Sequence, residues 1–489
     1  EIRLSLVGSE MCIRDRANIT FEANTVNGVG IPGGAKQATA TVSGERWANT
    51  GMVYVVHDDL VLAPGFKLTI APGMIVKLAG RTSIVVQGAL DTRGTAEDPI
   101  TFTSLNDDAV GGDTDNDGPT TPAAPEDWGW IEYSATSDDG ASYVQHAVIR
   151  YGGLEQFGCC SAPRRGAIVL VDAQPTLSNI TFEQNRFNGV GIPGGTKAAT
   201  ATNASERWAN TGVVYIVHDD LIVADGFKLT ISPGMIVKFE PRASLYVQGA
   251  LEARGAEGRP ITFTSINDDA TGGDTDNDGA ATAPQADDWG WVQFDNSSKD
   301  SESAIERAIF RYSGLEQYGC CSAPRRSAII LFNAQPTLTH ITFTQNRFNA
   351  VGIAGGDQTA DELWANTTVP YLVESDVVVK EGAKLTITPG MVVKFAGQVS
   401  IYVQGSLDAQ GTAAAPLIFT SLNDDTVGGD SDADGSATPP QPRDWGWIEF
   451  QDSSRDAGST LIYATIRYSG QEQLSLIHIS EPTRLRRIS

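Results

Sequence analysis

Short apolar segments that alternate with polar positions recur along the chain and predict β-strands. Examples from the first quarter of the sequence are VYVVHDDLVLA, KLTIAPGMIVKLA, SIVVQGALDTRG and PITFTS. They are rich in β-branched residues and are separated by Pro-Gly, Gly or Asn-Asp turns, as is typical of strands. No segment keeps the helical period of about 3.6 residues over ten or more positions. The pattern therefore predicts an all-β fold.

The spacing of these segments indicates how the strands are connected. Core-type segments recur about every 15 to 20 residues, whereas Asn-Gly turns between matched strands are scarce. Such spacing favours successive rungs of a coil, in which each rung covers the one below and only the two ends have open edges. We therefore expect a solenoid.

The chain is a tandem array. NITFEANTVNGVGIPGG at 18–34 returns as NITFEQNRFNGVGIPGG at 179–195, and DWGW at 127–130 returns at 288–291, both after 161 residues. A third DWGW follows at 444–447, after 156 residues. This register defines three units, 17–177, 178–338 and 339–473, the last of them truncated. No linker rich in Pro, Ser or charge separates them, so we expect one continuous solenoid.

Both ends depart abruptly from this register. Residues 1–16 and 474–489 do not match the positions that the repeat assigns to them, and they resemble translated sequencing-adapter sequence of the kind found at the ends of environmental assembly fragments. We treat both segments as non-native and exclude them from functional reasoning. The expectation is then that the natural termini, with any secretion signal or surface anchor, lie outside this sequence.

Residues 68–104, with their counterparts at 229–265 and 385–421, resemble the right-handed parallel β-helix repeats of secreted bacterial surface proteins. The shared pattern runs Leu-Thr-Ile, Pro-Gly, Val-Lys, Val-Gln-Gly-x-Leu and Pro-x-x-Phe-Thr-Ser. The resemblance implies a right-handed parallel β-helix with long loop insertions. It implies less about activity, since such helices include adhesins, stalks, polysaccharide lyases and hydrolases. With six or seven rungs per unit at about 4.8 Å each, the rod would measure roughly 85 to 100 Å.

The charge balance narrows the range of partners. The chain has 35 Lys and Arg against 60 Asp and Glu, a net charge of −25. Binding to nucleic acid or to an anionic membrane needs clustered basic residues, so neither is expected. No apolar run approaches the roughly 18 to 20 residues that would cross a bilayer, and no transmembrane segment is expected.

Each unit carries a long acidic loop before its DWGW, and we call these three segments (105–127, 266–288 and 422–444) the acidic loops. Their centres read DTDNDG, DTDNDG and DSDADG, which matches the first half of an EF-hand calcium loop. The position that should hold the closing Glu is occupied by Ala124, Gln285 or Gln441, so the Asp of DWGW is expected to close the site. The predicted ligands are Asp113, Asp115, Asp117 and Asp127; Asp274, Asp276, Asp278 and Asp288; and Asp430, Asp432, Asp434 and Asp444.

The alternative interpretation of the acidic loops is a solvated segment kept for solubility. In the third copy Thr114 becomes Ser431 and Asn116 becomes Ala433, while every Asp of the DxDxDG pattern stays. This selective retention favours metal binding. We therefore predict about three structural calcium sites, to which the upstream residues Asn106, Asp107 and Asp108 and their counterparts would also contribute.

The cysteines outside the ends form two adjacent pairs, and the pairs are too far apart along a rod to join each other. A bridge within each pair, free thiols and bonds to another chain remain open. In an oxidising exterior we favour the bridge within each pair. The residues are Cys159, Cys160, Cys320 and Cys321.

Other residue groups first suggest chemistry but have plain structural interpretations. His57 and His218 each precede two aspartates, yet the third copy has Glu374 there. Tryptophans of the WANT and WGW segments suggest sugar stacking, although most tryptophans seal a core. Arg150 and its counterparts suggest the base of a lyase, although they follow a strand repeat closely.

These observations favour a structural or adhesive function. Near-identical copies supply length and repeated binding faces, whereas a catalytic site needs one constellation of different residues. We expect a non-enzymatic, calcium-stiffened segment of a large secreted or cell-surface bacterial protein, whose partners would be polysaccharide or another cell surface. The alternative is a polysaccharide-active enzyme, such as a calcium-dependent lyase.

Overall fold

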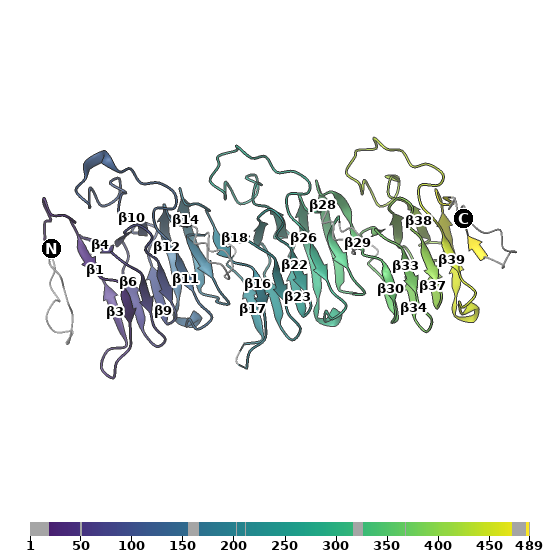
Figure 1. The fold of residues 1–489 in the computed structure, drawn as a ribbon, viewed down its shortest axis with the longest axis horizontal. Coiled ribbons are helices and arrows are strands. Elements are labelled where there is room, and N and C mark those ends of the chain that lie inside the picture. The colour runs from purple at the N-terminus through teal and green to yellow at the C-terminus, as the bar shows by residue number, and fades with distance from the viewer. Residues whose placement is uncertain are drawn as a thin grey trace, which may run out of the picture.

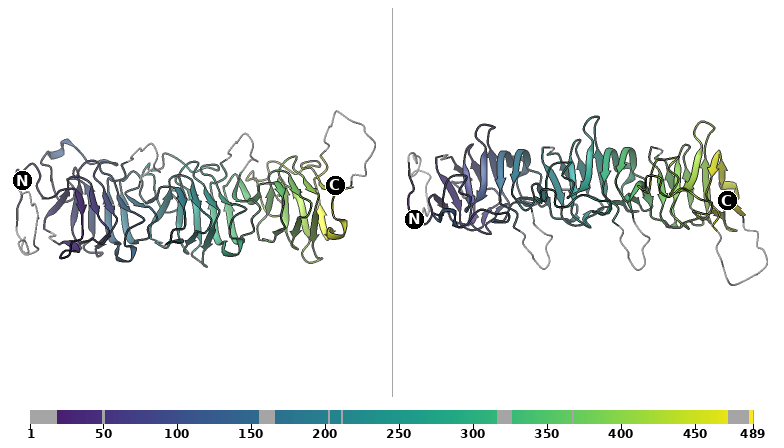
Figure 2. Two further views of the ribbon diagram at one scale, coloured as in Figure 1. Left: turned by 60° about the horizontal axis from the view of Figure 1, so that its bottom comes forward. Right: turned by 90° about the horizontal axis from the view of Figure 1, so that it is seen from above.

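The protein is an elongated all-β rod (Figures 1 and 2). The computed structural model describes residues 19–48, 51–154, 166–201, 203–210, 212–315, 326–366 and 368–471, and the backbone of 486–488. Within these ranges the named strands pair in parallel except for β39 with β42, and the helices are short 3₁₀ turns. The parallel β-helix predicted from the sequence is confirmed.

Each unit builds three stacks of parallel strands, which we call its first, second and third ladders. The first and second units also have two long strands each, which span the third and first ladders. In the first unit the first ladder is β1 (Val29–Ile31), β4 (Val53–Val56), β7 (Ile75–Leu78) and β10 (Ile100–Ser104). The second is β2 (Gly34–Lys36), β5 (Leu60–Leu62), β8 (Ile84–Val86), β11 (Ile131–Tyr133) and β13 (Ile168–Leu170). The third is β3 (Gly44–Trp47), β6 (Lys67–Ile70) and β9 (Ala89–Arg93), and the long strands are β12 (Tyr143–Arg150) and β14 (Thr176–Glu183).

The second unit repeats this plan. Its first ladder is β15 (Val190–Ile192), β18 (Val214–Val217), β21 (Ile236–Phe239) and β24 (Ile261–Ser265). Its second is β16 (Gly195–Lys197), β19 (Leu221–Val223), β22 (Leu245–Val247), β25 (Val292–Phe294) and β27 (Ser327–Leu331). Its third is β17 (Ser205–Trp208), β20 (Lys228–Ile231) and β23 (Ala250–Arg254), with the long strands β26 (Ala304–Arg311) and β28 (Thr337–Thr344).

The third unit is shorter. Its first ladder is β29 (Phe348–Ile353), β32 (Tyr371–Val373), β35 (Val392–Phe395), β38 (Leu417–Ser421) and β41 (Ala464–Ile466). Its second is β30 (Gly356–Gln358), β33 (Val377–Val379), β36 (Ile401–Val403) and β39 (Ile448–Phe450), on which β42 (Arg486–Ile488) pairs. Its third is β31 (Glu362–Trp364), β34 (Lys384–Ile387), β37 (Ser406–Gln410) and β40 (Thr460–Ile462). The 3₁₀ turns are Gly118–Thr120, Asp139–Ala141, Asp300–Glu302 and Asp456–Gly458.

The units are joined by hydrogen-bonded strands. β13 pairs with β11 of its own unit and with β15, the first strand of the second unit, and β27 joins β25 to β29 in the same way. The predicted boundaries at 177/178 and 338/339 lie inside β14 and β28. One coil therefore runs through all three units, as the absence of linkers predicts.

The rod is shorter than the sequence suggested. The path β2-β5-β8-β11-β13-β15 takes five steps from the first rung of one unit to the first rung of the next, which at about 4.8 Å per step gives a repeat of roughly 24 Å. The expectation of six or seven rungs was too high because β12 and β14 each serve two ladders and loops take up more of each unit. His146 at the bend of β12 has a φ of 46°, so the strand turns a corner without a loop.

The coil interior is a continuous apolar core that contains six tryptophans, and all nine tryptophans of the chain are buried. Phe239 stacks on Trp289 with 4.2 Å between ring centroids, and Phe395 stacks on Trp445 at 4.0 Å. This burial contradicts the sugar-stacking interpretation and assigns the rings to packing. The residues are Trp47, Trp128, Trp130, Trp208, Trp289, Trp291, Trp364, Trp445 and Trp447.

The WANT segment has a second structural task. The side chain of Asn210 accepts a hydrogen bond from the Leu177 amide at 3.0 Å and donates to the Pro175 carbonyl at 3.1 Å. Asn366 makes the same pair of contacts with Leu338 and Pro336. A side-chain amide thus replaces the next strand along part of the exposed edge of β14 and of β28.

Candidate metal centres

The three acidic loops leave the coil between β10 and β11, β24 and β25, and β38 and β39, and all three lie on the same side of the rod (Figure 1). Searching the described residues for clusters of metal-ligating side chains gives one group of carboxylates per loop, and within a group the oxygens lie within 4.8 Å of one another. Each group is suited to hold a metal ion. The groups are Asp108, Asp113 and Asp115; Asp269, Asp274 and Asp278; and Asp425, Asp430 and Asp432.

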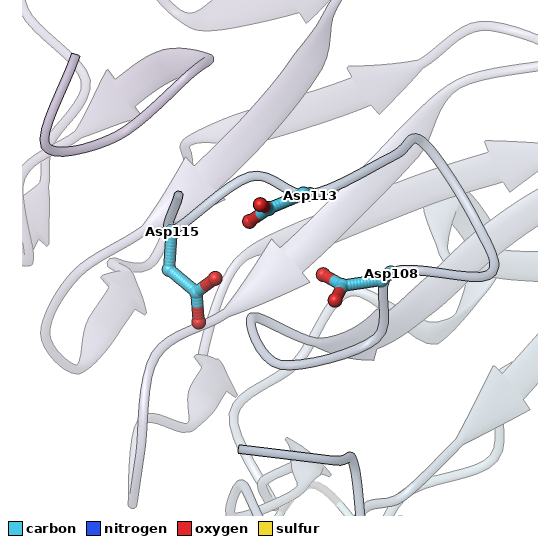
Figure 3. Close-up of side chains that lie close together, drawn as sticks. All are labelled: Asp108, Asp113 and Asp115. Atoms are coloured by element: carbon cyan, nitrogen blue, oxygen red, sulfur yellow. The ribbon is translucent and has the colours of Figure 1, made fainter. Parts of the chain in front are cut away.

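Carboxylates of the first group converge on a common point (Figure 3). Asp113 and Asp115 come from the DxDxDG sequence, where the amide of Gly118 donates to Asp113 Oδ2 at 3.1 Å and closes the turn. The third member, Asp108, lies upstream. Gly118 has a φ of 64° and Asn116 one of 57°, so this turn needs the left-handed conformations that Gly and Asn adopt most readily.

Several carboxylate oxygens of the acidic loops, most of them in these groups, are buried and receive no hydrogen bond. They include Oδ1 of Asp108 and Asp115 and, in the second loop, Oδ1 of Asp269 and Asp276. A buried carboxylate oxygen without a donor costs free energy, and a cation would remove that cost. In the third loop the corresponding atoms are Oδ1 of Asp425, Asp430 and Asp432.

Electrostatics at the groups also favours a cation. Burial, together with Asp113, raises the pKa of Asp108, and burial, together with Asp117, raises that of Asp115. Burial and the neighbouring aspartates raise the pKa of Asp276 and of Asp432 to about 6. Carboxylates that repel each other in this way gain from a shared positive ion.

A buried lysine under each loop is a feature that the sequence interpretation missed. Lys77 of β7 is fully buried, and its Nζ donates to the carbonyls of Asp107 and Gly112, both at 2.8 Å. Lys238 and Lys394 take the same position, with Nζ donating to Gly273 O at 2.8 Å and to Gly429 O at 2.6 Å. Burial lowers the pKa of Lys238 to about 8. The sequence signal that could have indicated this lysine is the Val-Lys pair, which every copy retains.

The start of each loop is held by an ion pair. Asp107 is almost fully buried and accepts from Thr103 Oγ1 at 2.5 Å, and Arg150 lies 3.3 Å from the same carboxylate oxygen. Arg311 pairs with Asp268 at 3.0 Å, and Arg467 with Asp424 at 2.6 Å. These arginines therefore anchor the loops, in agreement with their repeated position.

Apolar packing holds the body of the loop. In the second unit Phe187, Val214, Ile216 and Ile266 form a small cluster of buried side chains outside the coil. A Cβ on Gly272 of the loop would lie 2.6 Å from Val214, so only glycine permits this approach. This packing holds the acidic loop against the coil.

The predicted closing ligands take another position. Oδ2 of Asp127 accepts from Ser104 Oγ at 2.6 Å, Asn106 Nδ2 at 3.2 Å and the Ala124 amide at 3.1 Å. Asp288 and Asp444 do the same in their units. Their carboxylates hold the two ends of the loop together and are outside the groups, and Asp108, Asp269 and Asp425 are the additional carboxylates.

The remaining predicted ligands differ among the copies. Asp278 belongs to the second group, whereas Asp117 and Asp434 are outside the first and third. Asp434 instead accepts from the amides of Ala437 and Thr438 at 2.9 and 2.7 Å. Asp276 is outside the second group, although its Oδ1 is buried without a donor. The DxDxDG pattern thus gives each loop two members of its group, although not always the same two.

The remaining candidates from the sequence are the histidine positions and the cysteine pairs. The structure shows hydrogen-bonded, buried side chains at two of the histidine positions, and the cysteines lie outside the described ranges. His218 is buried, with Nδ1 2.9 Å from Glu240 Oε2, while its counterpart His57 is exposed. Glu374 of the third copy is buried and accepts from Ser327 Oγ at 2.5 Å. The candidates Cys159, Cys160, Cys320 and Cys321 lie outside the described residues, as does Cys12. Of the two adapter-like segments, only the backbone of 486–488 is described.

The comparisons with known proteins point to the same architecture. A family model described as a pectate-lyase like β-helix domain matches residues 356–432. Protein bark beetle of Drosophila melanogaster is 33% identical over 69 residues, which cover 14% of this chain and 2% of that protein. No solved structure matches the chain significantly. In the described residues no helix has the length and apolar character to span a membrane. Together with the parallel ladders, the family match identifies the chain as a β-helix repeat protein.

Proposed function

We propose that this chain is a non-enzymatic rod within a large secreted or cell-surface bacterial protein, and that each acidic loop binds one structural calcium ion. The observation that carries the proposal is the set of buried carboxylate oxygens that receive no hydrogen bond, repeated in three loops. Ligands that are all carboxylate oxygens suit a hard cation such as calcium. The rod would display its loops toward polysaccharide or another cell surface.

The expected affinity is modest. Three carboxylates supply only part of the six to eight oxygens that calcium takes, and a buried lysine lies beside each group. We expect three calcium ions per chain, with dissociation constants on the order of 10⁻⁴ to 10⁻³ M, the range of extracellular modules. At millimolar calcium the ion would act as a permanent fastener.

Single substitutions should remove the ions one at a time. Asp108→Asn, Asp269→Asn and Asp425→Asn each take away one carboxylate whose Oδ1 receives no donor. Calorimetry should show two equivalents of bound calcium instead of three in each single variant, since the sites lie on separate loops. Asp278→Asn should also remove one equivalent, whereas its matched control Asp117→Asn should remove none, because only Asp278 belongs to a group. Unchanged uptake in the triple variant would leave the loops as solvated acidic segments.

Calcium binding should weaken in mild acid. Because burial and neighbouring aspartates raise the pKa of Asp432 to about 6, a proton competes with the ion at this member of the third group. The third site should lose about tenfold in affinity from pH 7 to pH 5, the ratio of ionised fractions of Asp432 at those two pH values. Calcium titrations at both pH values test this, and equal affinity at the two would contradict it.

A second candidate is a polysaccharide lyase, because the family match carries that description and reaches the third acidic loop. Against it, the three arginines that suggested a lyase base are paired with buried aspartates. Incubation with polyuronates and calcium should give no ultraviolet-absorbing unsaturated product. Product that disappears in Arg467→Ala would establish the enzyme instead.

A further inference from the structure

Two short segments lie where successive units join. They are the NRFN sequences at 185–188 and 346–349, each separated by one residue from the end of β14 or β28, and the second runs into β29. Each begins and ends with asparagine. We call the segments the asparagine clasps, and the corresponding sequence in the first unit is Asn24-Thr-Val-Asn27.

The first asparagine of a clasp is inserted into the unit that precedes it. Asn185 is fully buried, its Nδ2 donates to Ile149 O at 2.8 Å, and its Oδ1 accepts from the Gly152 amide at 2.9 Å. Both partners belong to the first unit. The fully buried Asn346 likewise donates to Phe310 O at 2.9 Å and accepts from the Ser313 amide at 3.1 Å.

The second asparagine holds the acidic loop of the unit that follows. The amide of Asn188 donates to Thr275 O at 2.7 Å, and its Nδ2 lies 3.2 Å from Asp274 O. Asn349 makes the same contacts with Ser431 O at 2.8 Å and Asp430 O at 3.3 Å. In each loop the contacted carbonyls belong to the DxDxDG segment. One of them is the carbonyl of Asp274 or Asp430, whose side chain belongs to the metal group.

The two asparagines are also joined to each other. Asn185 donates to Asn188 Oδ1 through its backbone amide at 3.2 Å and through Nδ2 at 3.3 Å. Asn346 contacts Asn349 in the same way, at 3.3 and 3.1 Å. A chain of hydrogen bonds therefore runs from the last rungs of one unit to the metal-binding segment of the next.

An ion pair adds the preceding acidic loop to this connection. Arg186 contacts Glu126 of the first acidic loop, and Arg347 contacts Asp287 of the second at 2.8 Å. These pairs are about one-third exposed, so each contributes little on its own. The buried amides, whose loss would leave carbonyls and amides unpaired inside the wall, provide most of the connection.

We propose that Asn185 and Asn346 are positioning residues that act across a unit boundary, each fixing the acidic loop of the following unit in its cation-binding conformation. By linkage, a cation bound in one loop then stabilises the junction with the preceding unit by the same factor. The clasp itself follows from the hydrogen bonds alone; only this linkage rests on the proposed calcium function.

Amide hydrogen exchange of the full chain in chelator tests the clasp without any ion. Asn185→Ala should speed exchange in 269–279 by about tenfold, as about 1.4 kcal/mol of lost local stability would, while 108–118 and 425–435 stay unchanged. Asn346→Ala should shift the effect to 425–435. Asn24→Ala is the matched control, because within the described residues Asn24 contacts Asn27 and has no preceding unit to enter. Unchanged exchange in 269–279, or equal loosening of all three loops, would overturn the proposal.

Two further measurements keep the outcomes separate. Asn188→Ala keeps the two hydrogen bonds of Asn185 to the first unit and removes the side-chain contact with Asp274 O, so it should give a smaller loosening of the same loop even if Asn185→Ala folds poorly. In calcium, Asn185→Ala should weaken one of three equivalents about tenfold; three unchanged equivalents would refute the linkage. If calcium protects no loop of the wild type, the calcium function fails, whereas the exchange pattern in chelator still decides the clasp.

Discussion

Trp289→Ala is expected to destabilise the second unit by about 3 to 5 kcal/mol, the range for removing a large buried aromatic. The ring is fully buried, stacks on Phe239, and its Nε1 donates to Arg311 O at 2.8 Å. Alanine would leave a cavity and an unpaired carbonyl. Trp289 also follows the Asp that joins the two ends of the acidic loop, so the loop should loosen with the core.

The loss should be local. In a solenoid each rung contacts its neighbours, so stability is a sum of local terms and a defect opens the damaged region first. Urea unfolding followed by hydrogen exchange should show the second unit opening before the other two. Leu363→Ala, at a position 41% exposed, is the control and should change stability by less than about 0.5 kcal/mol. A loss shared equally by all units would contradict the local picture.

We expect the third unit to lose stability as pH rises. Gln358→Lys is expected to remove much of that loss. In the second unit the buried Glu206 pairs with Lys197 at 2.8 Å and accepts from Trp208 Nε1 at 2.6 Å. In the third unit Trp364 Nε1 donates to Glu362 at 2.8 Å, but the lysine position is Gln358. Burial raises the pKa of Glu362 to about 7.

The direction follows from proton linkage. A carboxyl whose pKa is raised by folding binds its proton more tightly in the folded state, so its contribution is most favourable below the unfolded value of 4.5 and is lost as pH rises to 7. A difference of about 2.5 between the pKa values of Glu362 in the folded and unfolded states corresponds to about 3 kcal/mol in the free energy of unfolding. Glu374, whose pKa burial also raises to about 7, adds a similar trend. The variant should therefore remove roughly half of the fall.

Urea midpoints of the third unit at pH 5 and pH 8 measure this effect. The reciprocal variant, Lys197→Gln, should create a fall of the same sign in the second unit, where Glu206 would lose its partner. Glu362→Gln should flatten the pH profile as Gln358→Lys does. If Gln358→Lys and Lys197→Gln each change the urea midpoint by the same amount at pH 5 and at pH 8, the buried glutamates do not titrate in this range.

The parts of the fold that could be predicted are those that the sequence repeats three times. The strands around Lys67–Ile70 follow an alternating pattern that stacking rungs require, and the offset of 161 residues defined the units. The number of rungs was overestimated because the pattern does not show that β12 continues around a corner at His146. Neither does it show that β13 and β27 join the units.

The candidate site was only partly predictable, for a related reason. The spacing of Asp113 and Asp115 identified the turn, because alternate residues of a tight loop point to one centre. Asp108 was among the upstream candidates, whereas Lys77 was not singled out, because its place under the loop depends on the return of the loop onto β7. Asp127 was predicted as a ligand because the closing Glu is missing at Ala124, yet its hydrogen bonds join the two ends of the loop.

The most direct test of the calcium proposal is anomalous diffraction from crystals grown with calcium or terbium. The account predicts one peak in each acidic loop, between the carboxylates of Asp108, Asp113 and Asp115 and between those of the two corresponding groups. It also predicts that Asp127, Asp288 and Asp444 remain bound to their serine partners. Acidic loops without a peak at millimolar ion, or peaks centred on these three aspartates, would contradict it.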